Sequence, residues 1–470
     1  MKYQSTKNPS KLFSFAQAAL GGLAPDGGLF IPQSIPRYRE SVKNSLSSMS
    51  FTEIALETIK PYVEGEIPNP VLEELCAGAF PFIAPLIPVS YNLKSPMEEP
   101  SLMELFHGPT AAFKDFGARF MARTFSFLRK NEDRTLRILV ATSGDTGGAV
   151  ADGFFGVEGI SVTVLYPKGR VSELQEKQIA GLGGNISALA VQGSFDDCQA
   201  LVKSAFTDPV LQDRLELSSA NSINICRLIP QAVYYAAVAG KAQKGSYDND
   251  GEATPRAKKE GGSLPPVTPP EFSRQVIFCV PSGNFGNLTA GLYAFSMGAP
   301  IAGFIAATNI NKTVPDYLQS GEYKTRVSQA TISNAMDVGA PSNFERMAAH
   351  WSYAQLRQMI RGVYVNDDET RNSIAEVFHN YGYYLDPHGA VGWTGIKKLQ
   401  ALNAAGQDAP LAGDSVIVAA TAHPAKFSET VESITGPVPV PAVIEKALGR
   451  TARSITIPAD LSVLRDYLLG

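Results

Sequence analysis

The sequence contains little that would support a disulfide framework, a structural metal or a membrane anchor. Its four cysteines are scattered among 470 residues without a Cys-x-x-Cys pair, and none has a histidine at metal-ligand spacing. No segment holds about eighteen uninterrupted apolar residues, the length that a transmembrane helix needs. Lysine and arginine number 41 against 45 aspartates and glutamates, so no basic field is available for nucleic acid. These absences leave small molecules as the expected partners.

Length and composition predict a globular protein of more than one domain. A chain of 470 residues with 44% hydrophobic content can build two or three domains. The first residues, Met1 to Lys7, carry charges that no apolar run follows, so no secretory leader is indicated. We therefore expect a cytoplasmic protein, bound neither to nucleic acid nor to a membrane, that is a monomer or a small homo-oligomer.

Short β-rich apolar runs alternate with helical patterns from Leu136 onward. This alternation is typical of a parallel sheet flanked by helices, so the predicted fold class is α/β. Open α/β sheets bind ligands at the carboxyl ends of their strands, and several of these runs end directly in Gly, Ser or Thr. Chemistry is therefore expected in the residues that follow each run. The predicted strands are 137–141, 162–166, 186–191, 276–280 and 415–420.

Lys114 lies in an apolar, turn-punctuated stretch, FHGPTAAFKDFGAR, that predicts the start of a helix. Aromatic neighbours on both sides would desolvate its ammonium and favour the neutral amine, which is the form that attacks a carbonyl. Pyridoxal phosphate is the carbonyl compound that such a lysine is expected to bind. An isolated Phe-Lys-Asp tripeptide is more often a surface helix start, so the prediction depends on the rest of the chain.

A phosphate site is predicted at residues 281–291, PSGNFGNLTAG, between the strand 276–280 and a helix. Glycines let successive N–H groups converge on an anion, and a helix N-terminus adds partial positive charge. A Gly-rich turn is by itself weakly informative, because many such turns are only tight connections. Here the serine and the two asparagines between the glycines would add side-chain donors that a bare turn does not need.

Two further strand ends carry polar residues. Residues 142–149, TSGDTGGA, suit a substrate carboxylate, with Asp145 better placed against an ammonium or a ring hydroxyl. A plain helix N-cap would explain the same residues. Thr421 follows the strand 415–420 and could meet a pyridine nitrogen without protonating it, or could only cap the strand. His423, beside a proline, is equally well explained by packing in a loop.

The run NSINICR, residues 221–227, places two amides, a hydroxyl and a guanidinium within two helical turns. Asn221, Asn224 and Arg227 would share one face and form a fork for a phosphate ester. A helix cap followed by an exposed arginine is the alternative. The later segment DPHG, residues 386–389, predicts a turn.

With these residues assembled, the chain resembles threonine synthase, in the shorter microbial and fungal form of this fold type II pyridoxal-phosphate enzyme. The resemblance rests on segments in a fixed order that span nearly the whole chain. They are GLAPDGGLFIP, LFHGPTAAFKDFGARF, TSGDTGGAVADGF, NSINICRLIPQ, PSGNFGNLTAG, DPHGAVG and TAHPAKF. The stretch from Lys241 to Gln275 departs from the family pattern, but it lies between matched blocks and removes none of them.

The resemblance implies pyridoxal 5'-phosphate as the cofactor, bound as a Schiff base to the catalytic Lys114. The other cofactor-binding residues that it implies are Gly283, Asn284, Phe285, Asn287 and Thr421. It also implies that O-phospho-L-homoserine and water are converted to L-threonine and phosphate. The substrate-binding residues that it implies are Ser143, Gly144, Asp145, Thr146, Asn221, Asn224 and Arg227.

The resemblance also divides the chain into domains, with the active site between two parallel-sheet α/β domains. Residues 1–105 would form an N-terminal cap of the threonine-synthase type, and residues 106–240 the smaller domain with the Schiff-base lysine. Residues 241–275, rich in charged residues, Gly, Ser and Pro, would be a disordered linker or insertion. A polyproline segment for a partner is the alternative there. Residues 276–470 would form the larger domain with the phosphate site.

Two other functions stay open from the sequence. A different fold type II lyase, such as a threonine or serine dehydratase or a phosphoserine-using enzyme, would keep the lysine, the phosphate site and the sheet. The NSIN run and the long N-terminal segment favour threonine synthase over these lyases. A catalytically silent binder of phosphorylated ligands would gain little from a desolvated lysine, so Lys114 argues against it.

Overall fold

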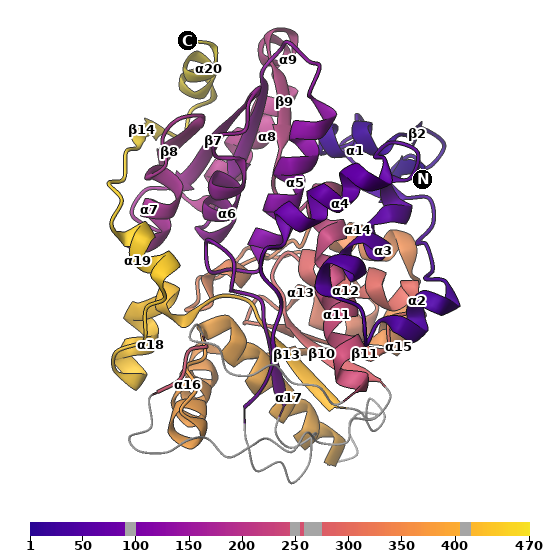
Figure 1. Cartoon of the computed structure of the whole chain (residues 1–470). Coiled ribbons are helices and arrows are strands. Elements are labelled where there is room, and N and C mark those ends of the chain that lie inside the picture. Colours follow the sequence, from indigo (N-terminus) through magenta and orange to yellow (C-terminus); the bar gives the residue numbers. More distant parts are fainter. Residues whose placement is uncertain (90–99, 245–253, 258–274, 405–414) are drawn as a thin grey trace.

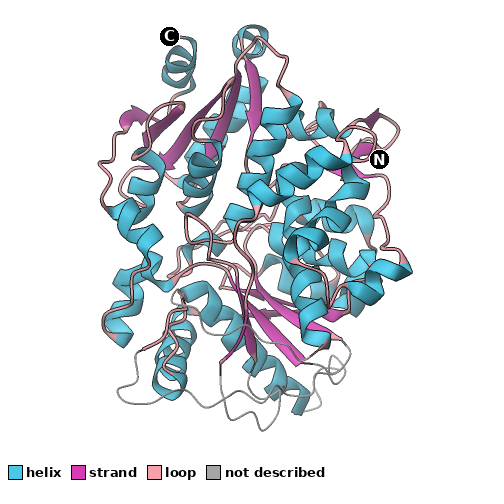
Figure 2. Ribbon diagram, in the orientation of Figure 1, coloured by secondary structure: helices cyan, strands magenta, loops and turns pink. Residues whose placement is uncertain are grey.

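The computed structural model describes residues 1–89, 100–244, 254–257, 275–404 and 415–470. Two large sheets lie one above the other in Figure 1, and a small antiparallel sheet lies beside them near the N-terminus. Helices surround each large sheet (Figure 2). This arrangement is the α/β class predicted from the alternating apolar runs.

The upper sheet in Figure 1 is parallel throughout, with the order β14-β8-β7-β6-β9. Its central strands are nearly all apolar because both faces are covered. Ile138 and Val140 of β6 face the main core, whereas Leu139 and Ala141 face a second core beneath α8 and α20. The strands are β6 (Leu136–Ala141), β7 (Ile160–Pro167), β8 (Ile186–Gln192), β9 (Glu216–Ser219) and β14 (Ile455–Pro458).

The lower sheet has the order β12-β11-β10-β13-β5-β4, and β4 alone among these strands runs antiparallel to its neighbour. Its strands are β4 (Leu86–Pro88), β5 (Ser101–Glu104), β10 (Val276–Pro281), β11 (Ile301–Thr308), β12 (Ile360–Tyr364) and β13 (Ser415–Ala420). The five strands predicted from the sequence correspond to β6, β7, β8, β10 and β13. The other strands, including the eight-residue β11, were not predicted from the sequence.

Helices form the layers around the sheets, and several begin with a capping box, at Ser14, Ser50, Ser172, Ser194, Ser352 and Asn366. The helices before β9 are α1 (Phe15–Gly21), α2 (Glu40–Ser45), α3 (Phe51–Val63), α4 (Asn69–Ala79), α5 (Lys114–Leu128), α6 (Asp145–Phe154), α7 (Glu173–Ala180), α8 (Phe195–Thr207) and α9 (Pro209–Arg214). Those after β9 are α10 (Ile225–Leu228), α11 (Ala232–Gln243), α12 (Gly286–Met297), α13 (Thr313–Ser320), α14 (Phe344–His350), α15 (Tyr353–Met359), α16 (Asp367–Tyr381), α17 (Pro387–Ala404), α18 (Ser428–Thr435), α19 (Ala442–Leu448) and α20 (Leu461–Leu469). Short 3-10 turns are η1 (Ile229–Gln231), η2 (Asn334–Met336) and η3 (Pro424–Phe427).

The N-terminal segment packs behind α5, the helix that begins at Lys114. It contains the antiparallel strands β1 (Tyr3–Ser5), β2 (Leu12–Phe13) and β3 (Phe30–Pro32). Its aromatic side chains surround Phe116 of α5, whose ring centre lies 4.9 Å from that of Phe82 and 5.9 Å from that of Phe80. The Phe82 contact is edge-to-face, and aromatic pairs of this kind contribute to stability beyond the area that they bury. The segment therefore supports the lysine-bearing helix from its outer side.

The predicted boundary at residue 105 is wrong, because β4 (86–88) and β5 (101–104) belong to the lower sheet. Strand β5 pairs in parallel with β13, from Ser101 opposite Ile417 to Glu104 opposite Ala420, and β4 pairs with β5. These strands are only three and four residues long. Their hydrogen-bonding partner β13 lies far away in the sequence, so local periodicity gives no sign of the pairing.

The C-terminal end of the predicted larger domain is part of the upper sheet, not of the lower one. After β13 the chain runs through α18 and α19 along one side of the molecule to the upper sheet (Figure 1). There β14 pairs in parallel with β8, and α20 packs on α8. Arg465 of α20 makes an ion pair with Asp208, the N-cap of α9. Residues 276–470 therefore contribute to both sheets.

Part of the predicted linker 241–275 is packed against the protein. Thr254 donates a hydrogen bond to the buried carboxylate of Glu104 (3.2 Å), and Arg256 makes a backbone bridge with Tyr383. The prediction of a disordered linker is wrong for residues 254–257 and for residues 241–243, which end α11. Residues 245–253 and 258–274 of that prediction lie outside the described residues. No helix of the described ranges is long and apolar enough to cross a membrane.

We expect truncation of Leu464 in α20 to destabilise the upper sheet. Leu464 is fully buried in the core that also holds Leu139 and Leu165, so Leu464→Ala should lower the free energy of unfolding by about 3 kcal/mol. Urea unfolding followed by circular dichroism measures the loss. The matched control is Leu448→Ala, at a side chain 37% exposed, which should cost no more than about 0.5 kcal/mol. Equal losses in the two variants would contradict this packing.

Candidate active site

The lysine predicted to react is the first residue of α5, and the backbone before it is joined to the segment after β13. Phe113 donates its backbone N–H to the carbonyl of Thr421 (2.8 Å), and His423 donates to the carbonyl of Ala111 (3.1 Å). Ala111 has a φ of 54°, a left-handed conformation that non-glycine residues rarely adopt. The two segments therefore fix each other, and they bring Lys114 next to Thr421.

Burial makes Lys114 a weaker base than an ordinary lysine. Its side chain is 14% exposed, and the amine lies 5.0 Å from the centre of the Phe113 ring. Desolvation lowers the pKa of Lys114, and the nearby carboxylate of Asp145, 3.5 Å away, opposes that effect. The charge of Lys426 and the charge of Arg227 lower the pKa further. The desolvated lysine expected from the sequence is thus present.

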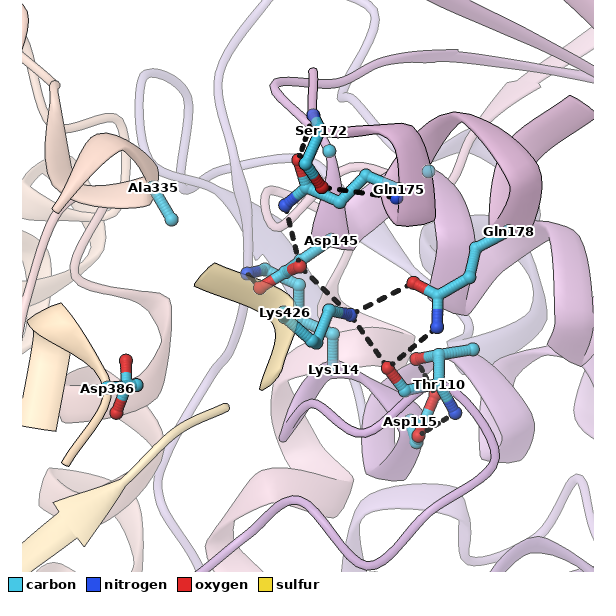
Figure 3. A network of polar contacts seen from close by, with 12 residues as sticks. Thr110, Lys114, Asp115, Asp145, Ser172, Gln175, Gln178, Ala335, Asp386 and Lys426 are labelled. Atoms are coloured by element: carbon cyan, nitrogen blue, oxygen red, sulfur yellow. Dashed lines mark hydrogen bonds and ion pairs between the residues drawn. The ribbon is translucent and has the colours of Figure 1, made fainter. Parts of the chain in front are cut away.

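Asp145 is the anion at the centre of a polar network that Figure 3 shows. Its Oδ1 accepts a hydrogen bond from Gln175 Nε2 (3.0 Å) and makes an ion pair with Lys426 (3.0 Å), while Oδ2 faces Lys114. The two lysines hold the pKa of Asp145 well below its usual range in spite of burial. Asp145 therefore faces ammonium groups, as expected, and does not suit contact with a substrate carboxylate.

The loop between β6 and α6 carries donors for an anion. Thr142 Oγ1 accepts the N–H groups of Gly144 (3.0 Å) and Gly147 (2.8 Å), which fixes the turn. Gly144 has a φ of 138°, and a Cβ there would lie 2.3 Å from the Gln175 side chain. Ser143 and Thr146 are half-buried, and their hydroxyls make no hydrogen bond to the described part of the chain. These hydroxyls stay available to a ligand.

The predicted phosphate site lies between β10 and α12, and its backbone is strongly constrained. Phe285, the N-cap of α12, has a left-handed φ of 61°. A Cβ on Gly283 would lie 2.7 Å from Met336 Cα and 2.8 Å from the carbonyl oxygen of Ala335, both of them in η2. Only glycine therefore fits beneath η2. A glycine-containing turn at the start of a helix is the setting in which backbone N–H groups and the helix N-terminus bind an anion.

The side chains of this site differ from the prediction that serine and both asparagines add donors. Ser282 donates to the carbonyl of Val280 (2.9 Å), and Asn284 donates to Ser222 Oγ (2.6 Å). Asn287 accepts hydrogen bonds from Tyr234 and Tyr235, and its buried Nδ2 has no partner among the described residues. A buried amide donor without an acceptor is unfavourable, so Asn287 fits a site that a ligand completes.

The run 221–227 does not form the single helical face that we expected. Helix α10 begins only at Ile225, and Asn224 is its N-cap. Asn224 Oδ1 accepts the N–H of Cys226, and its Nδ2 donates to the carbonyls of Ala19 (2.8 Å) and Ser219 (2.9 Å). The chain itself therefore uses both Nδ2 hydrogens and one acceptor position of Oδ1, and the substrate-binding role of Asn224 stays a prediction.

Arg227 and Asn221 remain suited to binding a ligand. Arg227 is fully buried, donates to the carbonyl of Ala220 (2.6 Å), and faces no carboxylate within the described ranges. Its Nε is buried without a partner there, and desolvation lowers the pKa of its guanidinium to about 10. Asn221 donates to the carbonyl of Ala141, which joins this run to the end of β6. A buried cation without an anion fits an anionic ligand.

Several residues of the site escaped the sequence analysis. Lys426 lies within the TAHPAKF motif, which supported the family resemblance but indicated no role for this lysine. Gln175 and Gln178 lie in helix α7, whose sequence gave no sign of a functional site. His388 accepts the N–H of Ala335 (3.3 Å) and pairs with Asp386 (2.7 Å). The DPHG segment, predicted as a turn, is instead the start of α17, and it supports η2 above the phosphate site. Contacts of this kind join distant segments and leave no local pattern.

Comparison with known proteins agrees with this geometry. Residues 2–80 match the family described as "Threonine synthase N terminus", and residues 390–468 match "Threonine synthase, C-terminal". The threonine synthase of Haemophilus influenzae is 40% identical over 475 residues, and that of Escherichia coli is 38% identical over 473, with 100% of both chains covered in each comparison. The chain belongs to the threonine synthase family. The family predicted from the sequence is thereby confirmed.

Solved structures of threonine synthases share the whole fold. The Escherichia coli threonine synthase superposes with a TM-score of 0.84 at 38% identity, covering 100% of this chain and 99% of that one. A PLP-bound threonine synthase from Brucella melitensis superposes with a TM-score of 0.83 at 33% identity, covering 100% and 98%. A pyridoxal 5'-phosphate-dependent aspartate racemase, 11% identical with a TM-score of 0.52, shares the fold alone. The fold type II architecture predicted from the sequence is confirmed.

We expect Gly283→Ala to weaken binding of pyridoxal 5'-phosphate by about 30-fold, because the new Cβ collides with the backbone of η2 and displaces the phosphate site. Titration of the cofactor-free protein with pyridoxal 5'-phosphate, followed by absorbance, measures the affinity. Gly449→Ala is the matched control, since its nearest neighbour would be 3.7 Å away and its φ is negative. Unchanged affinity in Gly283→Ala would place the phosphate elsewhere.

Proposed function

We propose that this chain converts O-phospho-L-homoserine and water to L-threonine and inorganic phosphate, with pyridoxal 5'-phosphate bound at Lys114. Threonine synthase activity and this cofactor, both predicted from the sequence, are confirmed by family membership and by the PLP-bound relative. The observation that carries the assignment to this site is the buried amine of Lys114, which desolvation makes less basic and which lies beside Asp145, after β6, and beside the segment that follows β13.

The described residues fit the cofactor. We assign its phosphate to the N–H groups of Gly283, Asn284 and Phe285 and to the unpartnered Nδ2 of Asn287. Thr421, whose backbone pairs with the segment before Lys114, is assigned to the ring nitrogen. A hydroxyl at that position does not supply a full charge, so the ring nitrogen stays neutral. When bound, the cofactor withdraws electrons from the substrate carbons next to its amine and makes their protons acidic.

Lys114 moves protons at the substrate carbons. A base works best when its pKa lies near the working pH, and burial brings the pKa of Lys114 down toward that range. Asp145 lies within 3.5 Å and stabilises the amine each time that it carries a proton. The loop with Ser143, Gly144 and Thr146 supplies N–H and hydroxyl donors for the substrate carboxylate. Asp145 is assigned to Lys114 rather than to that carboxylate.

Asn221 and Arg227 are assigned to the substrate phosphate. The C–O bond at the γ-carbon breaks as phosphate leaves, and negative charge grows on the departing group. A buried guanidinium stabilises that charge more strongly than an exposed one because little water screens it. Asn284 and Asn343 both hold Ser222, so the run that carries Arg227 is fixed against the phosphate site.

The remaining expectations about partners and location are part of this proposal. Family membership supports a small-molecule substrate. We further propose that the protein binds neither nucleic acid nor a membrane, and that it is a monomer or a small homo-oligomer. A cytoplasmic location is supported by the four cysteines, all of them buried free thiols.

The direct test of the reaction is to supply the holoenzyme with O-phospho-L-homoserine and to quantify phosphate and threonine together. We expect equal yields, and Lys114→Ala should lower the rate by about 10³-fold or more because the base is lost. A keto acid with phosphate, in place of threonine, would identify a lyase that does not rehydrate its intermediate. Absence of phosphate release would refute the proposed substrate.

Replacement of Arg227 should separate substrate binding from cofactor binding. We expect Arg227→Ala to lower kcat/KM for O-phospho-L-homoserine by about 30-fold or more, because a charge-assisted hydrogen bond is lost, while affinity for pyridoxal 5'-phosphate changes little. Steady-state kinetics and cofactor titration provide the two values. The exposed Arg371→Ala serves as the control variant. Equal losses of cofactor and substrate affinity would assign Arg227 to the cofactor phosphate instead.

A further inference from the structure

Lys426 is a fully buried lysine whose three ammonium protons all have acceptors. Its Nζ lies 3.0 Å from Asp145 Oδ1, donates to the carbonyl of Thr110 (2.7 Å), and donates to Gln178 Oε1 (3.1 Å). A lysine with no exposed surface is unusual, and it is kept charged only when its surroundings compensate for desolvation. Figure 3 shows these three contacts leaving the Lys426 ammonium, one of them toward the Asp145 carboxylate that also faces Lys114.

The contacts of Lys426 join elements from the two large sheets. Lys426 lies in η3, which follows β13 of the lower sheet, whereas Asp145 begins α6 and Gln178 lies in α7, both after strands of the upper sheet. Asp145 Oδ1 is occupied by Lys426 and by Gln175, so Oδ2 is the oxygen left to face Lys114. Lys426 thereby sets both the position and the orientation of the carboxylate.

Lys426 also changes how strongly that carboxylate acts on Lys114. The charged groups that face Lys114 are Asp145 on α6, Lys426 on η3 and Arg227 on α10. With Lys426 present, the negative charge of Asp145 is shared between two ammonium groups. Without it, the same charge would act on Lys114 alone, the nearby positive charge would disappear, and the protonated form of Lys114 would be favoured.

Asp115 is a further buried carboxylate near Lys426, and it has different partners. It accepts the N–H (2.8 Å) and the hydroxyl (2.6 Å) of Thr110, whose carbonyl binds Lys426. Burial raises the pKa of Asp115 to about 6, although both hydrogen bonds oppose the shift. Asp115 thus fixes the Thr110 acceptor for Lys426, and Asp145 is the carboxylate that faces the amine.

We propose that Lys426 is a positioning residue, which holds the Asp145 carboxylate at Lys114 and shares its charge so that Lys114 can lose its proton during the reaction. This inference rests on the proposed function in one respect, because it takes Lys114 to be the residue that binds the cofactor. Lys426 itself touches neither cofactor nor substrate in this role.

The test is a spectrophotometric pH titration of the bound cofactor in the holoenzyme, since its absorbance reports the protonation of its bond with Lys114. We expect Lys426→Met to move the midpoint upward by about one pH unit, because an opposing positive charge is lost. Asp145→Asn should move the midpoint downward, and Lys426→Arg, which keeps the charge, should restore most of the wild-type value. The acid limb of kcat should follow the same shifts, with KM for O-phospho-L-homoserine changing little.

Lys398→Met is the control for the loss of a lysine and its ion pair, because Lys398 pairs with Glu369 on the outside of α17. It should leave the midpoint unchanged. An unchanged midpoint in Lys426→Met, with the wild-type melting temperature, would overturn the proposal. If Lys426→Met does not fold, Asp145→Asn and Lys426→Arg decide: an upward shift or no shift in Asp145→Asn overturns it as well.

Failure of this inference can be told apart from failure of the proposed function. If the wild-type holoenzyme binds the cofactor at a residue other than Lys114, its absorbance band survives in Lys114→Ala and the proposed function fails. If the band requires Lys114 but its midpoint ignores Lys426 and Asp145, the proposed function stands and the role of Lys426 is refuted.

Discussion

A single buried carboxylate between two lysine ammonium groups is the interaction on which the site depends. Burial of charged groups is strongly unfavourable unless each is paired and its remaining hydrogen-bonding capacity is used. Asp145 meets this requirement through Lys114, Lys426 and Gln175, and Lys426 meets it through Gln178 as well. Because these partners come from α5, α6, α7 and η3, the need to satisfy one carboxylate fixes four elements around the reactive amine. Displacement of any of them would remove an ionic or hydrogen-bonding partner from a buried charge.

The N-terminal segment contributes to the site by a different route. Its carbonyl groups at Ala19 and Phe30 accept hydrogen bonds from Asn224 and from the fully buried Arg346. Arg346 also donates to the carbonyl of Ile223. The run that carries Arg227 is therefore held from both sides by backbone acceptors of the first 32 residues and by α14. A segment expected only to cap the catalytic body thus orients a residue that we assign to the substrate.

The parts of the site that could be predicted were those that depend on local chemistry. Aromatic neighbours and a turn were enough to predict that Lys114 begins a helix in a desolvated position, and apolar runs were enough for five strands. The fate of Asn224 was not predictable, because its amide is used by the distant Ala19. Lys426 gave no sign of its role for the same reason, since its acceptors lie about 250 to 315 residues away in the chain. Pairing of β5 with β13 and of β14 with β8 is likewise decided by long-range contacts.

Under the proposed function, the site treats two phosphate groups differently. Residues 281–291 contain no lysine or arginine, so the cofactor phosphate is held by N–H groups, a helix N-terminus and the amide of Asn287. A phosphate that stays in place needs only to be held, and neutral donors do so without another cation near Lys114. A departing phosphate gains negative charge in the transition state, where a fixed guanidinium such as Arg227 stabilises it more than the ground state. The buried cation therefore lies where charge changes during the reaction.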